Sequence, residues 1–156
     1  MKTHSLILFL ILLSEVCFSQ WTIEFTSIRS FFNSITFATS SNGIIVGTEG
    51  IILRTSNSGE TWDVVNSNLS TTLRDVFFID SSKGWIVGDS GKVLITSNGG
   101  LTWTLINTNI TKKMYSVYFI DNLNGWMVGE NSIYKSTDGG YNWILKYSNI
   151  NHTFFD

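Results

Sequence analysis

Short apolar runs separated by turn residues recur along most of the chain. In one stretch they lie at Arg74–Ile79, Gly84–Asp89, Lys92–Thr96 and Trp103–Asn107. Valine, isoleucine, phenylalanine and tryptophan dominate these runs, as they dominate β-strands, and Gly, Asn, Asp and Ser lie between them. None of the runs has a clean polar face, which is typical of a sheet that is covered on both sides. The pattern therefore predicts four strands per unit, with a neighbour on each face.

This unit is repeated. A strand of the form Gly-x-x-Val-Gly begins at residues 43, 84 and 125, so consecutive copies lie 41 residues apart. A period of about 40 residues with four strands per unit is typical of β-propeller blades. We expect an all-β fold of three four-stranded antiparallel blades, at about residues 34–66, 75–107 and 116–147. A β-sandwich is the competing fold, but its strands lack a whole-unit repeat.

The repeat extends beyond these three blades at both ends. Trp21 lies 41 residues before Trp62, which predicts that a strand at 21–26 completes a last blade, and residues 153–156 begin a further one. Propellers close with about four to eight blades. We therefore expect residues 20–156 to form an incomplete propeller, as a fragment of a longer protein. Its open sheet edges are expected to make the isolated chain aggregate or oligomerise.

Residues 1–19 have the three parts of a secretory signal peptide. Lys2 supplies a positive start, residues 6–13 are all apolar, and Cys17 and Ser19 are small residues just before a cut at Gln20. This apolar run is too short to cross a bilayer, which takes about 20 residues. The mature protein is therefore expected to be exported, to the extracellular space, the cell surface or the periplasm, without a membrane span.

Composition narrows the function classes. The net charge is −2, so the basic excess of a nucleic-acid-binding protein is lacking. Hydrophobic residues make up 43% and aromatic residues 14% of the chain, which argues against disorder. After signal cleavage His152 is the only histidine and no cysteine remains, so we expect no metal site, no cofactor and no Ser-His-Asp triad.

A second repeated element, which we call the turn–Trp element, lies at residues 55–62, 96–103 and 136–143. In each copy an Asn or Asp can bond its own backbone two residues on, a glycine can adopt positive φ, and a tryptophan can lock the hairpin against its blade. We predict these structural roles for Asn57, Gly59, Trp62, Asn98, Gly100, Trp103, Asp138, Gly140 and Trp143.

The turn–Trp element resembles the Asp box of bacterial neuraminidase (BNR) repeats. Together with the Gly-Trp-x-Val-Gly strand, it looks like the propellers of photosystem II assembly factors, and related repeats occur in sortilin-like receptors and some glycoside hydrolases. The resemblance covers essentially residues 21–156. It implies that the Asp boxes are scaffold and face away from the functional surface. In the assembly factors it implies a protein partner held by basic residues on a propeller face.

The expected strand order places the connections between blades on the same side as the turns between second and third strands, opposite the turn–Trp elements. We call this side the connection face. It carries Arg29, Arg74, Lys112 and Lys113, together with Glu49, Asp89 and Glu130. The four cations form a candidate patch for an acidic partner, because charge complementarity guides encounter and specificity. The alternative interpretation of the lysine pair is a solvated loop.

Two aspartates, Asp80 and Asp121, recur at the 41-residue spacing. We interpret them as turn formers, and the alternative is the carboxylate pair of a glycosidase. By resemblance, a sialidase site requires three arginines, and the chain has only Arg29, Arg54 and Arg74. Arg54 precedes a turn–Trp element and is expected to point elsewhere. The Arg-Ile-Pro motif of sialidases cannot occur in a chain without proline.

These observations favour a secreted, non-catalytic propeller that acts as a scaffold for protein interaction or assembly. No complete catalytic constellation is present in the sequence. The alternative is a fragment of a secreted sialidase- or xyloglucanase-like glycoside hydrolase, or of a carbohydrate-binding propeller that takes an extracellular glycan.

Overall fold

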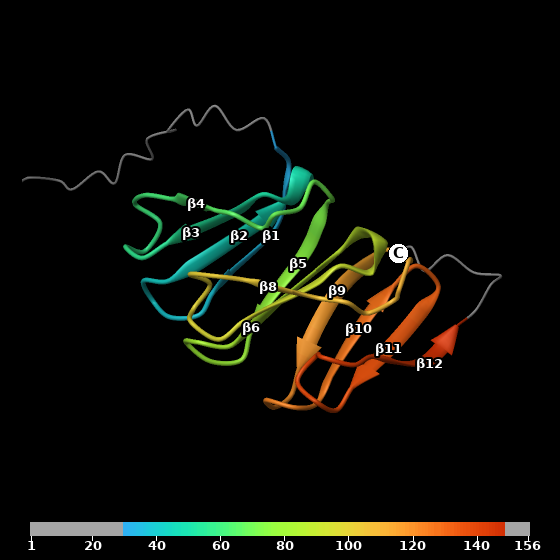
Figure 1. The fold of residues 1–156 in the computed structure, drawn as a ribbon. Coiled ribbons are helices and arrows are strands. Elements are labelled where there is room, and N and C mark those ends of the chain that lie inside the picture. The colour runs from blue at the N-terminus through green and yellow to red at the C-terminus, as the bar shows by residue number, and fades with distance from the viewer. Residues whose placement is uncertain (1–29, 149–156) are drawn as a thin grey trace, which may run out of the picture.

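The computed structural model describes residues 30–148, which form three four-stranded antiparallel sheets (Figure 1). The first sheet contains β1 (Phe32–Phe37), β2 (Gly43–Gly47), β3 (Ile52–Thr55) and β4 (Asp63–Val65). The second contains β5 (Leu73–Phe78), β6 (Gly84–Gly88), β7 (Val93–Thr96) and β8 (Thr104–Ile106). The third contains β9 (Met114–Phe119), β10 (Gly125–Gly129), β11 (Ser132–Ser136) and β12 (Ile144–Ser148). The predicted all-β fold of three four-stranded antiparallel repeats is confirmed.

Two short 3₁₀ turns complete the regular structure of this part of the chain, η1 (Thr48–Gly50) and η2 (Asp89–Gly91). No helix within residues 30–148 is long and apolar enough to cross a membrane. The predicted signal peptide, the strand at 21–26 and the strand start at 153–156 lie outside the described residues.

Each blade begins about two residues earlier than the repeat pattern suggested, because its first strand contains a bulge. Phe32 pairs with Gly47 and Ser34 with Val46, so Asn33 is the extra residue. The glycines of the second strand are required by close contacts. A Cβ at Gly84 would lie 2.9 Å from the ring of Phe78, and a Cβ at Gly88 would lie 2.4 Å from the carbonyl oxygen of Thr72.

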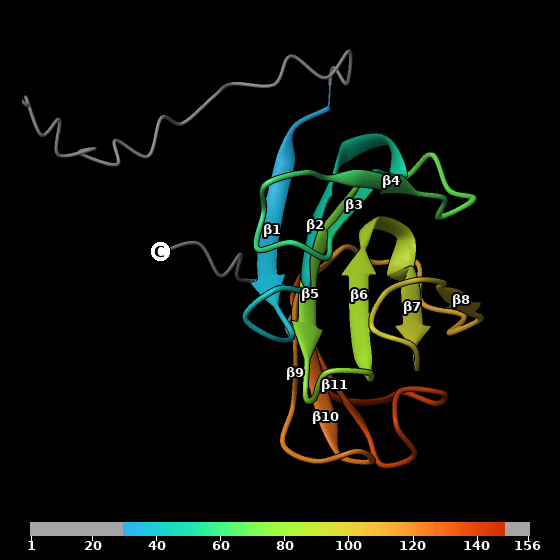
Figure 2. The same ribbon diagram turned by 90° about the vertical axis from the view of Figure 1, so that its left-hand side faces the viewer.

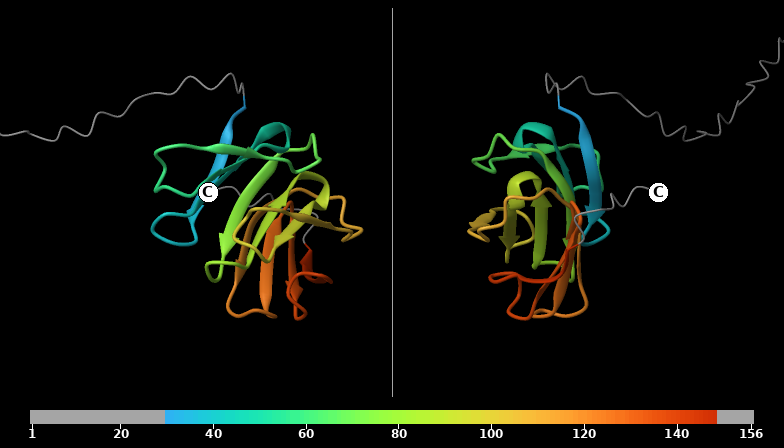
Figure 3. Two further views of the ribbon diagram at one scale, coloured as in Figure 1. Left: turned by 60° about the vertical axis from the view of Figure 1, so that its left-hand side comes forward. Right: turned by 90° about the vertical axis from the view of Figure 1, so that its right-hand side faces the viewer.

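The three blades stack through their first strands. β1, β5 and β9 lie side by side along one edge of the stack, and the fourth strands lie toward the opposite edge (Figures 2 and 3). This radial order of strands and the fan of sheets are those of a partial propeller.

Apolar residues fill both junctions between blades. The first junction joins one face of the first blade to the second blade through Ile44, Val46, Ile52, Leu73, Val76, Ile86 and Leu94. The second joins the second blade to the third through Trp85, Val87, Val93, Ile95, Met114, Val117, Phe119 and Met127. All residues of β6 and β7 are consequently buried. The prediction of a sheet covered on both faces therefore applies to the middle blade.

Candidate binding face on the inter-blade connections

The connection face is held in place by a hydrogen-bonding pattern that occurs in both described connections. Ser67 Oγ donates to the carbonyl oxygen of Gly50 at 2.6 Å, and Thr108 Oγ1 donates to that of Gly91 at 2.9 Å. Each hydroxyl also accepts the backbone N–H two residues on, from Leu69 in the first connection. The connections are therefore fastened to the turns η1 and η2 and are not free loops.

Lys112 and Lys113 lie where the second connection meets two turns at once. The carbonyl oxygen of Lys112 accepts the N–H of Gly91 at 2.7 Å, and that of Lys113 accepts the N–H of Glu130 at 2.8 Å. Lys113 is exposed, and Lys112 is half-buried with its Nζ 3.5 Å from Ser148 Oγ. The backbone of this lysine pair is thus fixed against the second and third blades, while an ammonium group remains accessible to a partner.

Arg74 belongs to the same face, but its charge is already paired. Its Nε and Nη2 donate to the two carboxylate oxygens of Asp89, the second at 3.2 Å, and the guanidinium lies 5.1 Å from the ring centroid of Tyr115. The hydrogen bond to Asp89 raises the pKa of Arg74 above its ordinary value. Of the predicted patch residues within 30–148, Lys112 and Lys113 are the two that form no ion pair with a residue of this part of the chain. Arg29 lies outside the described residues.

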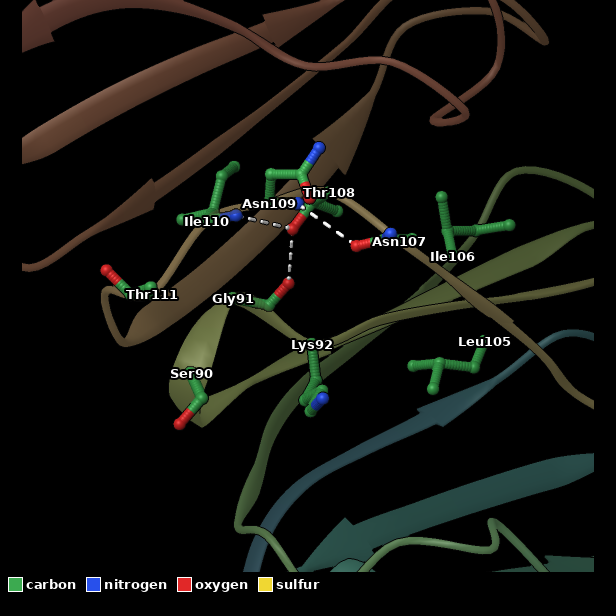
Figure 4. Close-up of a pocket in the computed structure, with 10 residues that line it drawn as sticks. All are labelled: Ser90, Gly91, Lys92, Leu105, Ile106, Asn107, Thr108, Asn109, Ile110 and Thr111. Atoms are coloured by element: carbon green, nitrogen blue, oxygen red, sulfur yellow. Dashed lines mark hydrogen bonds between the residues drawn. The ribbon is translucent and has the colours of Figure 1, made fainter.

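A cavity of about 520 Å³ opens beside η2 and the second connection (Figure 4). Thr108 lies in its wall, where its hydroxyl joins Gly91 and Ile110. The lining combines one ammonium, from Lys92, with the amides of Asn107 and Asn109 and several aliphatic side chains. This lining offers hydrogen bonds and apolar contact to a ligand, but no carboxylate or nucleophile–base pair.

Asp80 and Asp121 lie at the opposite side of the blades and cap their own turns. Asp80 Oδ1 accepts the N–H groups of Ser82 and Lys83, each at 2.7 Å, and Asp121 makes the equivalent bonds. The hydrogen bond from the Lys83 backbone, followed by those from Ser82, lowers the pKa of Asp80. The backbone bonds of Asn124 and Leu123 lower the pKa of Asp121 in the same way. A carboxyl that holds its proton this weakly is a poor general acid near neutral pH.

The turn–Trp elements lie on the same side as these aspartates, since the N–H of Gly99 donates to the carbonyl oxygen of Ser82 at 2.8 Å. In the first element, Thr55 Oγ1 accepts the N–H groups of Asn57 and Gly59. Asn57 Oδ1 then accepts the N–H of Thr61, four residues on, at 3.0 Å. The expected bond two residues on is replaced because the hydroxyl of Thr55 already serves the amide of Gly59.

The second and third turn–Trp elements repeat the contacts of the first. Asn98 bonds Thr102 and Asp138 bonds Asn142 in the same manner. Burial raises the pKa of Asp138, but hydrogen bonds from Asn142, Ser136 and Tyr141 outweigh it and the pKa is lowered overall. Each tryptophan packs edge-on against the phenylalanine that ends the first strand of its own blade, in the pairs Phe37–Trp62, Phe78–Trp103 and Phe119–Trp143. Gly59, Gly100 and Gly140 all have positive φ.

The hydrogen bonds that join one blade to the next were not predicted from the sequence. Trp85 Nε1 donates at 2.8 Å to the carbonyl oxygen of Gly139, in the turn–Trp element of the following blade. The first blade has Ile44 at the position of Trp85, and there Arg54 Nε donates at 3.1 Å to the equivalent carbonyl of Gly99. Arg54 is the cross-strand neighbour of Ile44. The pairing of Ile44 with Arg54 is the signal that could have shown that Arg54 replaces the tryptophan as hydrogen-bond donor. It places Arg54 between the first and second blades.

Among the described residues, no group of three or more His, Cys, Asp or Glu side chains is placed to hold a metal ion. The connection face thus combines two lysines whose backbone is fixed, an arginine paired with Asp89 beside an aromatic ring, and an adjacent cavity.

Comparison with known proteins agrees with this geometry. The family model described as photosynthesis system II assembly factor YCF48 matches residues 56–144. YCF48 from Cyanidioschyzon merolae is 25% identical with a TM-score of 0.67, over 77% of this chain and 41% of that chain. A structure of YCF48 bound to D1 peptide has 24% identity and a TM-score of 0.66, over 74% of this chain and 40% of that one.

An ancestral GH74 enzyme shares the fold alone, with 16% identity and a TM-score of 0.62 over 72% of this chain and 18% of the enzyme. No protein with a curated description matches the chain. The chain spans about two-fifths of the length of the two YCF48 structures.

Proposed function

Because the chain belongs to the photosynthesis system II assembly factor YCF48 family, we propose that it forms part of an exported, non-catalytic propeller scaffold that binds a segment of a partner protein. A YCF48 structure holds a D1 peptide, so peptide binding occurs in a protein of this fold. For this chain we expect the partner segment to be acidic, because it would meet the lysine pair of the connection face.

The observation that carries the proposal is the fixed lysine pair. The carbonyl oxygens of Lys112 and Lys113 hold the turns at Gly91 and Glu130. A partner that meets these ammonium groups therefore does not have to order a flexible loop, and preorganisation of this kind favours affinity. The carbonyl oxygen of Thr72, the residue equivalent to Lys113, accepts the N–H of Asp89 in the same way, so the two lysine side chains are what distinguishes this connection.

The surroundings of the lysine pair suit a peptide. The Arg74 guanidinium is paired with Asp89 and lies over Tyr115, so it offers a flat surface more than a net charge. The 520 Å³ cavity is lined by residues up to Thr111, directly before Lys112 in the chain. One extended acidic segment can therefore contact the lysines and also place an apolar side chain in the cavity.

Export and the lack of catalysis are parts of the same proposal. Export rests on the signal-like residues 1–19, and it predicts a mature protein whose N-terminus is Gln20. N-terminal analysis of the secreted or periplasmic protein tests this, and a retained N-terminus contradicts it. The non-catalytic part is supported by Asp80 and Asp121, whose carboxylates are used in their own turns. Release of product from sialosides or xyloglucan by the pure protein would overturn it.

The binding face is tested by site-specific photo-cross-linking in the organism that makes the protein. A photoreactive residue at Lys113 is expected to capture a partner, whereas one at Thr61, exposed on a turn–Trp element, is not. The captured protein is then purified, and its affinity is measured for Lys112→Glu/Lys113→Glu and for a control, Lys146→Glu. We expect the double reversal to weaken binding by more than about tenfold. An equal loss with the exposed control, or unchanged binding, refutes the face.

A further inference from the structure

The cavity beside η2 belongs to the middle of the described structure. Its lining comes from η2, the residue before β7, the end of β8 and the second connection, all within residues 90–111. The second blade, to which these residues belong, packs against a described blade on each of its faces. In Figure 4, Lys92 and Leu105 lie along one side of the cavity and the residues of the second connection lie along the other.

The walls of this cavity are fixed by hydrogen bonds and by one glycine. The hydroxyl of Thr108 donates to the carbonyl oxygen of Gly91 and accepts the N–H of Ile110 at 3.1 Å. Gly91 has a φ of +62°, and a Cβ there would lie 2.2 Å from the carbonyl oxygen of Ile110. Turn and connection can therefore approach this closely only at a glycine. The cavity is formed before any ligand arrives, which favours affinity.

Lys92 places an unpaired positive charge in the lining. Its side chain is half-buried, and no ion pair or hydrogen bond joins its ammonium to another residue of 30–148. The carboxylate of Asp89, three residues earlier, already pairs with Arg74. No acidic residue is among those that line the cavity. This part of the chain therefore supplies no counter-ion for the Lys92 ammonium.

Lys92 also departs from the repeat. It directly follows η2, and Ile51 holds the same place after η1 with nearly the same backbone, φ −63° against −65°. The corresponding residue of the third blade is Ser132, at the start of β11. The backbone of this position thus accepts residues of quite different chemistry. Neither the turn nor the sheet explains why a lysine stands in the second blade.

The lining combines this charge with aliphatic walls. Leu105 is 45% exposed, and Ile110 lies across the cavity from it. The volume of about 520 Å³ falls within the range of small-ligand pockets, about 300–1,000 Å³, so the cavity can hold more than one side chain. An apolar side chain alone would take water from the Lys92 ammonium and offer no partner in exchange, which is unfavourable. A carboxylate on a short aliphatic stem satisfies both parts of the lining.

We propose that Lys92 makes this cavity a subsite for a glutamate side chain of the partner segment. The two methylene groups of the glutamate contact Leu105 and Ile110, and its carboxylate pairs with the ammonium of Lys92. This inference rests on the proposed function, since the acidic segment expected there is the source of the carboxylate. It adds a specific requirement, because the lysine pair senses negative charge in general, whereas the cavity selects one acidic residue by its stem and its charge.

The test is ligand-observed saturation-transfer NMR on the whole chain, which also works if the protein is oligomeric. The probes are N-acetyl-glutamate methylamide and its glutamine analogue, together with N-acetyl-leucine and its methylamide. Dissociation constants are measured at pH 7 and low salt. We expect the glutamate probe to bind roughly three- to tenfold more tightly than the glutamine probe. Added salt should reduce this difference, because it screens the charge pair.

Two variants locate the charge that is responsible. Lys92→Met keeps the length of the side chain and removes the charge, so it should bind the glutamate and glutamine probes equally. Binding of the leucine methylamide probe to this variant shows that the cavity is intact. The matched control is the double variant Lys112→Met/Lys113→Met, which leaves Lys92 in place and is expected to retain the preference for glutamate.

Three results overturn the subsite. The first is equal binding of the glutamate and glutamine probes to the wild-type chain, which needs no variant to fold. The second is a preference that survives Lys92→Met and is lost in the control, which would assign it to the lysine pair. The third is a charge preference for N-acetyl-leucine over its methylamide without one for glutamate, which would make the ligand a chain terminus. None of these results touches the proposed function, which is tested by the response of the captured partner to reversal of the lysine pair.

Discussion

Alanine substitution at two equivalent glycines separates the energetic cost of backbone strain from the cost of disturbing the packing between blades. Gly59 and Gly140 occupy the same place in their turns and have nearly equal φ, 92° and 93°. A Cβ at Gly59 would meet Trp62 at an ordinary 3.6 Å, whereas one at Gly140 would lie 2.8 Å from Trp85 Nε1 and 3.3 Å from Ile95 Cδ1. Only the Gly140 substitution therefore disturbs the junction.

The expected magnitudes follow from these contacts. Positive φ in a residue with a side chain costs about 1–2 kcal/mol, so Gly59→Ala should lower the free energy of unfolding by that amount. Overpacking in a well-packed core costs about 1–3 kcal/mol more. Trp85 has little room to yield, since it stacks on Phe119 at 3.6 Å between ring centroids and its N–H is bonded to Gly139. Gly140→Ala should therefore lose about 2–5 kcal/mol in total.

The assay is equilibrium urea unfolding followed by tryptophan fluorescence. Equal losses for the two variants would refute the account of the junction, because the backbone strain is matched and only the contact with Trp85 differs.

Three further changes test the polar contacts of the fold. Trp85→Phe leaves the carbonyl of Gly139 without its donor, and urea unfolding should show a loss of at least about 1–3 kcal/mol. Asp75→Ala removes the carboxylate that accepts the Val117 N–H at 2.9 Å, with a similar expected loss of about 1–3 kcal/mol and a smaller one for Asp75→Asn. The pKa of Asp138 is lowered in the fold, so its contribution is present at neutral pH and is lost as the pH falls below about 4; Asp138→Asn should flatten that part of an acid unfolding curve.

The strands and the stacking were readable from the sequence because both depend on periodic features. Short apolar runs between turn residues located the strands, and the 41-residue period showed that the unit recurs. The first glycine of each second strand also follows from the repeat, since it lies against the ring of a phenylalanine such as Phe78. A local constraint that recurs in every blade selects the same residue type at the same position of each repeat, so it can be read from the sequence.

Pairings across the repeat were not readable, because they join residues whose relative direction depends on the packed structure. Arg74 and Asp89 were both placed on the connection face, but the ion pair that they form was not predicted from the sequence. At the first junction, Ile44 and Arg54 together take the place of the tryptophan that the second blade has at Trp85, and this was not predicted either. Each single residue departs from the repeat, and only their cross-strand pairing shows that they act together.

Some residues that depart from the repeat serve the scaffold and not a binding site. Asp75 stands where the other blades have Ser34 and Ser116, and its carboxylate accepts a hydrogen bond from both of them. Its departure is therefore used within the scaffold, as that of Arg54 is. Lys112 and Lys113 also depart from the repeat, but there the fold uses their carbonyl groups and leaves the ammonium of Lys113 exposed. A residue that departs from the repeat and whose side chain makes no contact within the fold is the better candidate for binding. Lys113 is exposed, whereas the side chains of Arg54 and Arg74 are bonded within the scaffold.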